Sequence, residues 1–129
     1  MVWLSHLPQN CPPPQAITAS GEVYRLVNHN SPHSEDFRSW REENMDKELP
    51  QGVSECQAGG LSVFKDKADA YRIIRKSPRF RKAKPALGIL TPNLGKILCN
   101  PSQSSQSHHT WWVPANEKPW TVFQVTNVD

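Results

Sequence analysis

The chain has 129 residues, a length that fits one domain with a single core and disfavours two independent ones. Twelve prolines against six glycines shorten every possible element and disfavour a helix bundle, and five tryptophans disfavour a wholly disordered chain. The net charge of +3 conceals a segregation, because residues 65–84 hold nine of the fifteen Lys and Arg but two of the twelve Asp and Glu.

The amino-terminal region carries no pattern of a signal peptide or a membrane anchor. Residues 1–20 contain four prolines, which fix φ and lack a donor, so this segment is predicted to be an extended Pro-rich arm that packs on its own domain. Recognition of the arm by an SH3-type partner is the alternative. No apolar run in the sequence approaches the length of a membrane span. We therefore expect a cytoplasmic protein without a membrane partner.

Residues 21–28 form the first predicted strand, because β-branched and aromatic side chains recur along GEVYRLVN. Ser31-Pro32 fits a helix N-cap followed by proline in the first turn, and this short helix is expected to end near Asn44. Gly59-Gly60 then leads into a second predicted strand at 61–64.

The longest predicted helix begins after Asp66, whose side chain can accept hydrogen bonds from free N–H groups of the first turn, and it ends at Ser77-Pro78. Two further strands, 86–90 and 96–99, flank a turn that has proline early and glycine late. A polar, serine-rich stretch at 100–110 predicts a flexible loop.

Together with a last strand at 120–125, these elements predict an α+β fold with a mixed or antiparallel sheet of about five short strands and two short helices. The domain is expected to span 21–129, after the Pro-rich arm at 1–20. Periodicity and turn chemistry place the following side chains in its core: Val23, Leu26, Val63, Phe64, Ile73, Ile74, Leu87, Ile89, Ile97 and Phe123.

A dense group of cations lies in residues 72–84, which we call the basic segment. Its cations and one aromatic ring are Arg72, Arg75, Lys76, Arg79, Phe80, Arg81, Lys82 and Lys84. Such cations can neutralise phosphates while Phe80 stacks on a base, a combination used in nucleic-acid binding. The alternatives are a solvated helix face and a docking surface for acidic residues of the chain itself.

A second candidate site contains two adjacent imidazoles followed closely by two adjacent indoles. His108 and His109 can supply a general acid or base, and Trp111 and Trp112 can form a stacking platform. In the alternative interpretation Trp111 closes the core, Trp112 lies at its rim, and both histidines make local hydrogen bonds. No acid or nucleophile lies at a telling spacing from them.

Metal binding and thiol chemistry find little support in the residues considered for them. Neither a C-x₂-C nor an H-x₃₋₅-H spacing joins these side chains: His6, Cys11, Cys56, Cys99, His108 and His109. We therefore expect no metal and no cofactor. The three cysteines are an odd number without close spacing, so they imply no complete disulfide framework and favour a reducing compartment, with Cys56 as a small buried residue.

The order of parts resembles that of small ADP-ribosyltransferase-like domains. The resemblance rests on Tyr24-Arg25 on an early strand and on Leu61-Ser62-Val63-Phe64 before a helix, followed by a β-rich half, and it covers about half of the chain. It implies that Arg25 and Ser62 line a dinucleotide cleft. The chain departs from the family at the late catalytic glutamate, because Glu117 lies in a loop flanked by prolines.

Two functions follow as expectations. The first is a binding module or accessory subunit whose basic segment binds nucleic acid or an acidic protein surface. The second is a small enzyme acting on a nucleotide or RNA, with Arg25, Ser62, His108 and His109 in its cleft. The two differ in geometry, because an enzyme requires His108 or His109 to converge with Arg25 or Ser62 in one concave pocket. The sequence does not specify the oligomeric state.

Overall fold

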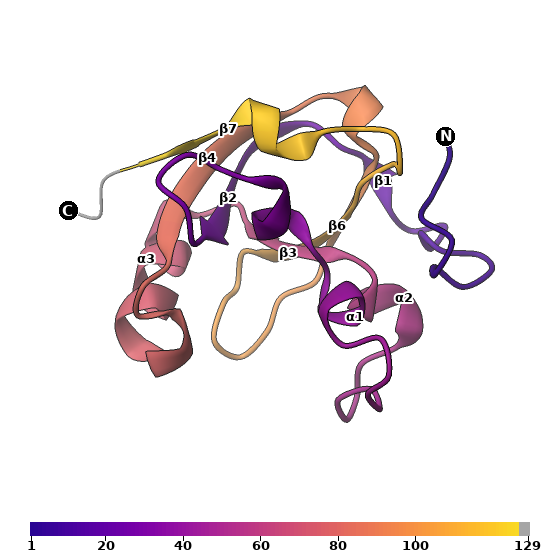
Figure 1. The fold of residues 1–129 in the computed structure, drawn as a ribbon, viewed down its shortest axis with the longest axis horizontal. Helices are drawn as coiled ribbons and strands as arrows, with labels where there is room; N and C mark the ends of the chain where they lie inside the picture. Colours follow the sequence, from indigo (N-terminus) through magenta and orange to yellow (C-terminus); the bar gives the residue numbers. More distant parts are fainter. Residues whose placement is uncertain (127–129) are drawn as a thin grey trace.

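The computed structural model describes residues 1–126, and a seven-stranded antiparallel sheet is its main structural element (Figure 1). The strand order is β1-β5-β6-β3-β2-β4-β7. The strands are β1 (Ile17–Thr18), β2 (Gly21–Val27), β3 (Leu61–Phe64), β4 (Lys84–Leu90), β5 (Lys96–Cys99), β6 (His108–Trp112) and β7 (Phe123–Val125). The helices are α1 (Trp40–Glu43), α2 (Glu55–Ala58) and α3 (Lys67–Lys76), with 3₁₀ turns η1 (Ser34–Phe37), η2 (Pro78–Phe80), η3 (Pro92–Leu94) and η4 (Pro119–Val122).

The α+β class agrees with these elements, but the sheet has seven strands rather than about five, and there are three α-helices rather than two. The short helix expected between Ser31 and Asn44 is divided into η1 and α1, because Ser39 between them has extended backbone angles and caps α1. The last strand is shorter than expected, since η4 occupies its first residues.

The first twenty residues do not form a separate arm. Within them β1 pairs with β5 through Ile17 and Ile97, and the carbonyl of Val2 accepts a hydrogen bond from the Ala115 amide at 2.7 Å. A disulfide also joins Cys11 to Cys56. The amino-terminal segment is thus part of the domain, held by a strand pair, a covalent bond and a loop contact.

The core lies around Trp111, which is fully buried on β6 and pairs with Leu61 of β3 and Ile97 of β5. Its ring stacks on Phe123 at a centroid distance of 5.8 Å. Of the expected core residues, the following are buried: Val23, Val63, Phe64, Ile97 and Phe123. A second group is half-buried: Leu26, Ile73, Ile74 and Leu87.

Ile89 was expected in the core but is 59% exposed. It pairs with Glu22 on β2, two residues along from the Tyr24–Leu87 pair. Tyr24 packs in the cluster that α3 covers, together with Phe64 and Tyr71. Ile89 therefore lies on the helix-covered face of the sheet but is not itself covered by the helix.

Helix α3 has the capping expected from the sequence. The Asp66 carboxylate accepts a hydrogen bond from the Ala68 amide at 2.9 Å, and Ser77-Pro78 ends the helix. Ala70 and Tyr71 are buried, while Arg75 and Lys76 are exposed. The helix therefore packs its apolar stripe on the sheet and presents its cations to the solvent.

Candidate functional site

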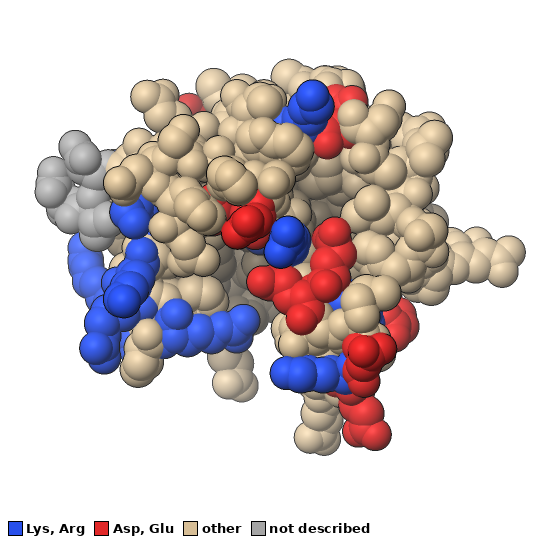
Figure 2. Space-filling model, viewed as in Figure 1, with Lys and Arg blue, Asp and Glu red and all other residues tan. Residues whose placement is uncertain are grey.

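The candidate site is a cleft of about 770 Å³ where β2 and β3 separate. These strands are paired only at Tyr24 and Phe64, and next to that pair the Arg25 side chain donates to the Ser62 carbonyl. The cleft is lined by α3 and η2 on one side and by η1 and α1 on the other. The loop before β6 forms a third wall. Figure 2 shows this hollow between a mainly basic and a mainly acidic flank.

Arg25, Ser62 and His108, which we call the cleft cluster, all line this space. Arg25 donates to three backbone carbonyls: Asp36 at 2.9 Å, Ser62 at 2.8 Å and Arg38 at 3.3 Å. Its guanidinium also lies 5.4 Å from the centre of the Phe37 ring. The side chain thus links β2, β3 and η1 at the point where the sheet opens.

The charge of Arg25 is held in a poorly hydrated position. Desolvation lowers its pKa to about 10, and this effect is partly offset by the carboxylates of Asp36, Glu43 and Glu42. The group therefore remains a cation at neutral pH. A guanidinium has more N–H donors than the three bonds use, so among residues 1–126 it keeps donors for an anionic or carbonyl-bearing ligand.

Ser62 and His108 form a hydrogen-bonded pair in which the donor and the acceptor can be assigned. His108 Nδ1 lies 2.7 Å from the Asn100 carbonyl, and Nε2 lies 3.0 Å from Ser62 Oγ. A carbonyl oxygen only accepts, so Nδ1 carries the proton, and in the neutral ring Nε2 accepts from the Ser62 hydroxyl. This arrangement is that of a hydroxyl beside an oriented base, which can take up a proton from Ser62 or from a ligand hydroxyl.

His109 is not part of this cluster. Its Nδ1 lies 2.8 Å from the Ser107 carbonyl, and the residue does not line the cleft. His108 and His109 are adjacent on β6, where successive side chains point to opposite faces of the sheet. The expectation that both histidines enter one cleft is therefore wrong for His109.

The basic segment is divided between the cleft and the outer surface. Arg72, Lys76, Arg79 and Phe80 line the cleft, whereas Arg75, Arg81 and Lys82 are exposed outside it. Lys84 begins β4, and its Nζ lies 3.5 Å from the Asn28 carbonyl. Figure 2 shows Lys and Arg gathered on this side of the molecule. The cleft therefore continues into a cationic outer face.

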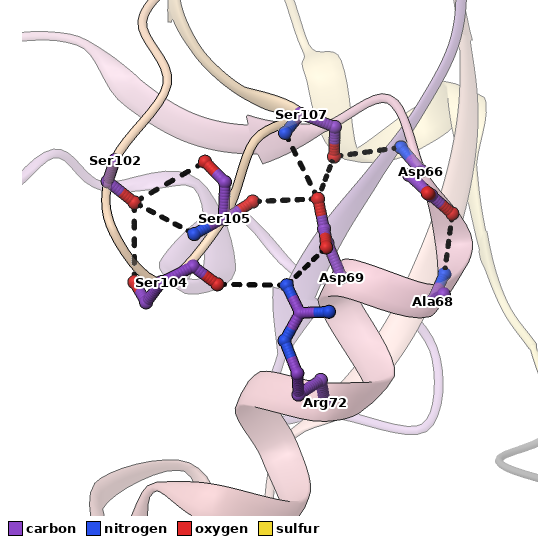
Figure 3. A network of polar contacts seen from close by, with 8 residues as sticks. All are labelled: Asp66, Ala68, Asp69, Arg72, Ser102, Ser104, Ser105 and Ser107. Atoms are coloured by element: carbon purple, nitrogen blue, oxygen red, sulfur yellow. Dashed lines mark hydrogen bonds and ion pairs between the residues drawn. The ribbon is translucent and has the colours of Figure 1, made fainter.

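The serine-rich loop before β6 is tied to α3 by Asp69 (Figure 3). This carboxylate accepts from Ser105 Oγ at 3.0 Å and from Ser107, both N at 3.0 Å and Oγ at 2.5 Å, and it forms an ion pair with Arg72. The Ser107 hydroxyl, with further help from Ser105 and Arg72, lowers the pKa of Asp69 from 3.8 to about 2.

Arg72 extends this network to the tip of the loop by donating to the Ser104 carbonyl at 2.9 Å. The tip itself lines the cleft through Ser102, Gln103 and Ser104. The stretch at 100–110 was expected to be a flexible loop, yet His108 already begins β6 and Ser105 is buried. The network thus fixes one wall of the cleft.

Of the aromatic rings that the sequence suggested for stacking, Phe80 lines the cleft, whereas Trp111 and Trp112 do not. Trp111 and Trp112 are both buried, with their indole N–H groups donating to the carbonyls of Leu94 and Cys56 at 2.8 Å. Neither ring is exposed to stack on a ligand, and Trp112 is not at a rim. Trp40 and Phe64 line the cleft together with Phe80. No sequence signal distinguished Trp40 from a core residue.

Helix α2 forms a further part of the wall through Gln57 and Ala58. Cys56 of this helix is bonded to Cys11, 45 positions earlier, with a Cα–Cα distance of 5.6 Å. The sequence implied no such pair, because two partners so far apart leave no spacing pattern. Disulfides persist in oxidising environments, so this bond gives no support to the expected cytoplasmic location.

A group of possible metal ligands lies beside the cleft: His29, His33 and Glu35, whose ligand atoms are within 4.8 Å of one another. Neither histidine was among the candidate ligands predicted from the sequence. A signal was present, because they are separated by three residues, a spacing found in metal sites.

Comparison with known proteins identifies no relative: no family model, no curated protein and no solved structure matches this chain. Among the helices of residues 1–126, none has the length and apolar character needed to cross a membrane. The cleft is therefore the feature that bears on the function of this chain.

Proposed function

We propose that the cleft binds a nucleotide and that the protein is a small nucleotide-directed enzyme. The observation that carries this proposal is the convergence of Arg25, Ser62 and His108 in one cleft whose opposite wall is cationic and aromatic. Concave sites with a few convergent polar groups are where ligands and substrates bind.

The distribution of charge in the cleft favours a ligand with two different ends. Arg72, Lys76 and Arg79 lie on one side, where they attract phosphate. Glu35 and Glu43 lie on the opposite side, where carboxylates accept hydrogen bonds from sugar hydroxyls or base amino groups. Trp40 and Phe80 offer flat apolar surfaces for a base. A nucleotide combines all three kinds of group.

The Ser62–His108 pair supports an enzyme rather than a passive binding site. Its base is oriented by the Asn100 carbonyl, as a general base requires. Arg25 and Ser62 on neighbouring strands are also what the resemblance to ADP-ribosyltransferase-like domains implies, which makes a dinucleotide such as NAD the first ligand to test. Glu117 gives this form no support, because it bonds to Asn93 at 2.6 Å and does not line the cleft.

The second candidate is the binding module that uses the basic segment against nucleic acid or an acidic protein surface. The observation in its favour is the exposure of Arg75, Arg81 and Lys82 outside the cleft. A polyanion laid across this face would contact these cations as well as those of the cleft wall. The two functions therefore differ in which cations the ligand needs.

Isothermal titration calorimetry with AMP, ADP, NAD and single-stranded RNA tests the proposal on a matched pair of variants, Arg79→Ala and Arg81→Ala. These cations are two residues apart, but only Arg79 lines the cleft. We expect a mononucleotide or dinucleotide to bind the native protein and Arg79→Ala to weaken it about tenfold, with Arg81→Ala within about twofold of native.

Turnover is measured as release of the base or nicotinamide from the nucleotide that binds. The native protein should catalyse this release, and Ser62→Ala and His108→Ala should each lose the activity. Nucleotides that fail to bind the native protein at millimolar concentration would overturn the proposal. Salt-sensitive binding of RNA that Arg79→Ala and Arg81→Ala weaken equally would favour the binding module instead.

A further inference from the structure

His29 is held in the orientation that metal-binding histidines adopt. Its Nδ1 lies 2.9 Å from Asp36 Oδ2, and the ring is 44% exposed while the carboxylate is buried. Asp36 is itself fixed, since its carboxylate accepts from the Asn28 amide at 2.8 Å and the His33 amide at 2.9 Å. With Nδ1 protonated toward the carboxylate, the neutral ring has its lone pair on Nε2, away from Asp36.

The other two ligand groups come from the same turn. The His33 ring stacks on His29 at a centroid distance of 4.8 Å, and Glu35 follows two residues later at the start of η1. His33 Nδ1 accepts from the Glu35 amide only at 3.5 Å, a long contact that the ring can give up when it turns. Both side chains are exposed, so they are free to rotate toward an ion.

We propose that His29, His33 and Glu35 bind one divalent transition-metal ion of the zinc type. Two imidazoles and one carboxylate are a ligand set that Zn²⁺ prefers, whereas Mg²⁺ and Ca²⁺ prefer oxygen alone. The ligand atoms lie within 4.8 Å of one another, and bonds to zinc bring such atoms to about 3.4 Å. Rotation of His33 and Glu35 supplies this contraction without moving the strand that carries Arg25.

Three protein ligands leave a coordination position open for water or a ligand. Glu35 and Asp36 also line the cleft, so the ion would lie at its acidic side, opposite Arg79. Asp36 would orient the metal ligand His29 with its carboxylate while its carbonyl accepts from Arg25. The metal site shares Glu35 with the cleft, but His29 and His33 do not line the cleft, so zinc binding measured without a nucleotide tests the metal site separately from the proposed nucleotide binding.

Zinc titration followed by calorimetry tests the site in a Cys99→Ser background, which removes the exposed free thiol as a competing ligand. We expect one Zn²⁺ per chain with a dissociation constant in the micromolar range or below. His29→Ala, His33→Ala and Glu35→Gln should each weaken binding at least about tenfold, and Asp36→Asn about tenfold to a hundredfold through His29. His109→Ala is the matched control, because it removes an imidazole outside the site, and it should leave affinity unchanged.

Thermal unfolding without zinc accompanies each variant to establish that it is folded. The proposal is overturned if zinc does not bind the Cys99→Ser protein, or if folded His29→Ala and His33→Ala variants bind it as tightly as their parent. It is equally overturned if His109→Ala loses as much affinity as they do. None of these outcomes bears on nucleotide binding, which is measured separately with Arg79→Ala.

Discussion

Arg25 and Arg79 line the same cleft but are held in opposite ways. Arg25 is desolvated and donates to three backbone carbonyls, so its position is fixed by the sheet and η1. Arg79 is exposed, and its guanidinium lies 5.1 Å from the centre of the adjacent Phe80 ring. The side chain of Arg25 is thus fixed in position by the backbone around it, whereas that of Arg79 can change its position.

The contrast separates two uses of charge in one site. A half-buried guanidinium with fixed partners organises the backbone around it, and its removal is costly because three carbonyls lose their donor together. An exposed guanidinium attracts an anion and contributes little to folding. Four variants test this division.

The largest expected effect is on stability, from Arg25→Met. This change keeps the apolar stem but leaves the carbonyls of Asp36, Ser62 and Arg38 without their donor. We expect the free energy of unfolding, measured in urea, to fall by about 3 kcal/mol.

Arg79→Met is the matched control for this change and should stay within about 0.5 kcal/mol of the native protein. Equal stabilities for the two variants would show that the carbonyl contacts of Arg25 do not hold the cleft together.

Asp69→Asn tests the loop that forms one wall of the cleft. Its effect on the free energy of unfolding should lie between those of Arg25→Met and Arg79→Met. The amide cannot accept as strongly from Ser105 and Ser107 or pair with Arg72, so unfolding should require about 2 kcal/mol less at neutral pH. The pKa of Asp69 is lower in the folded state, so its stabilisation is present above pH 3.8 and is lost as the pH falls toward 2.

Urea unfolding at a series of pH values measures both parts of this prediction. The native protein should lose stability more steeply than Asp69→Asn between pH 4 and 2. Parallel curves for the two proteins would mean that Asp69 is not held in its charged form by the loop.

The smallest effect is expected from the double substitution Arg81→Ala with Lys82→Ala. Both cations are exposed outside the cleft, and their removal relieves repulsion within the basic segment. The melting temperature should hold or rise slightly, which differential scanning calorimetry measures. A marked fall would indicate that these cations have structural partners.

Sequence patterns predicted the elements whose signals are local. Asp66 and Ser77-Pro78 mark the ends of α3, and Leu61–Phe64 is a strand as expected. β6 was missed because its first residues are polar, although Trp111 at its centre pairs with strands on both sides. A central strand such as β6 is stabilised mainly by pairing and packing with its two neighbouring strands. The periodicity of its own sequence does not reveal these contacts.

The candidate site was predicted only in part, because its geometry also depends on contacts between distant parts of the chain. Arg25, Ser62 and His108 were named as possible cleft residues, but their convergence depends on β2, β3 and β6 coming from distant parts of the chain. Trp40 begins the short helix α1 and the group around His29 lies at η1, and their positions depend on hydrogen bonds of Ser39 and Asp36. Such tertiary contacts leave no periodic trace in the sequence.

The order of strands in the sheet has a consequence for how the protein folds. Most neighbouring strands are distant in sequence: β6 pairs with β3, β4 with β2, and β1 with β5. The chain must close long loops before these pairings stabilise it, and such topologies fold in milliseconds to seconds rather than microseconds. The cleft forms at the separation of β2 and β3, so it is complete only when strands from both halves of the chain have met.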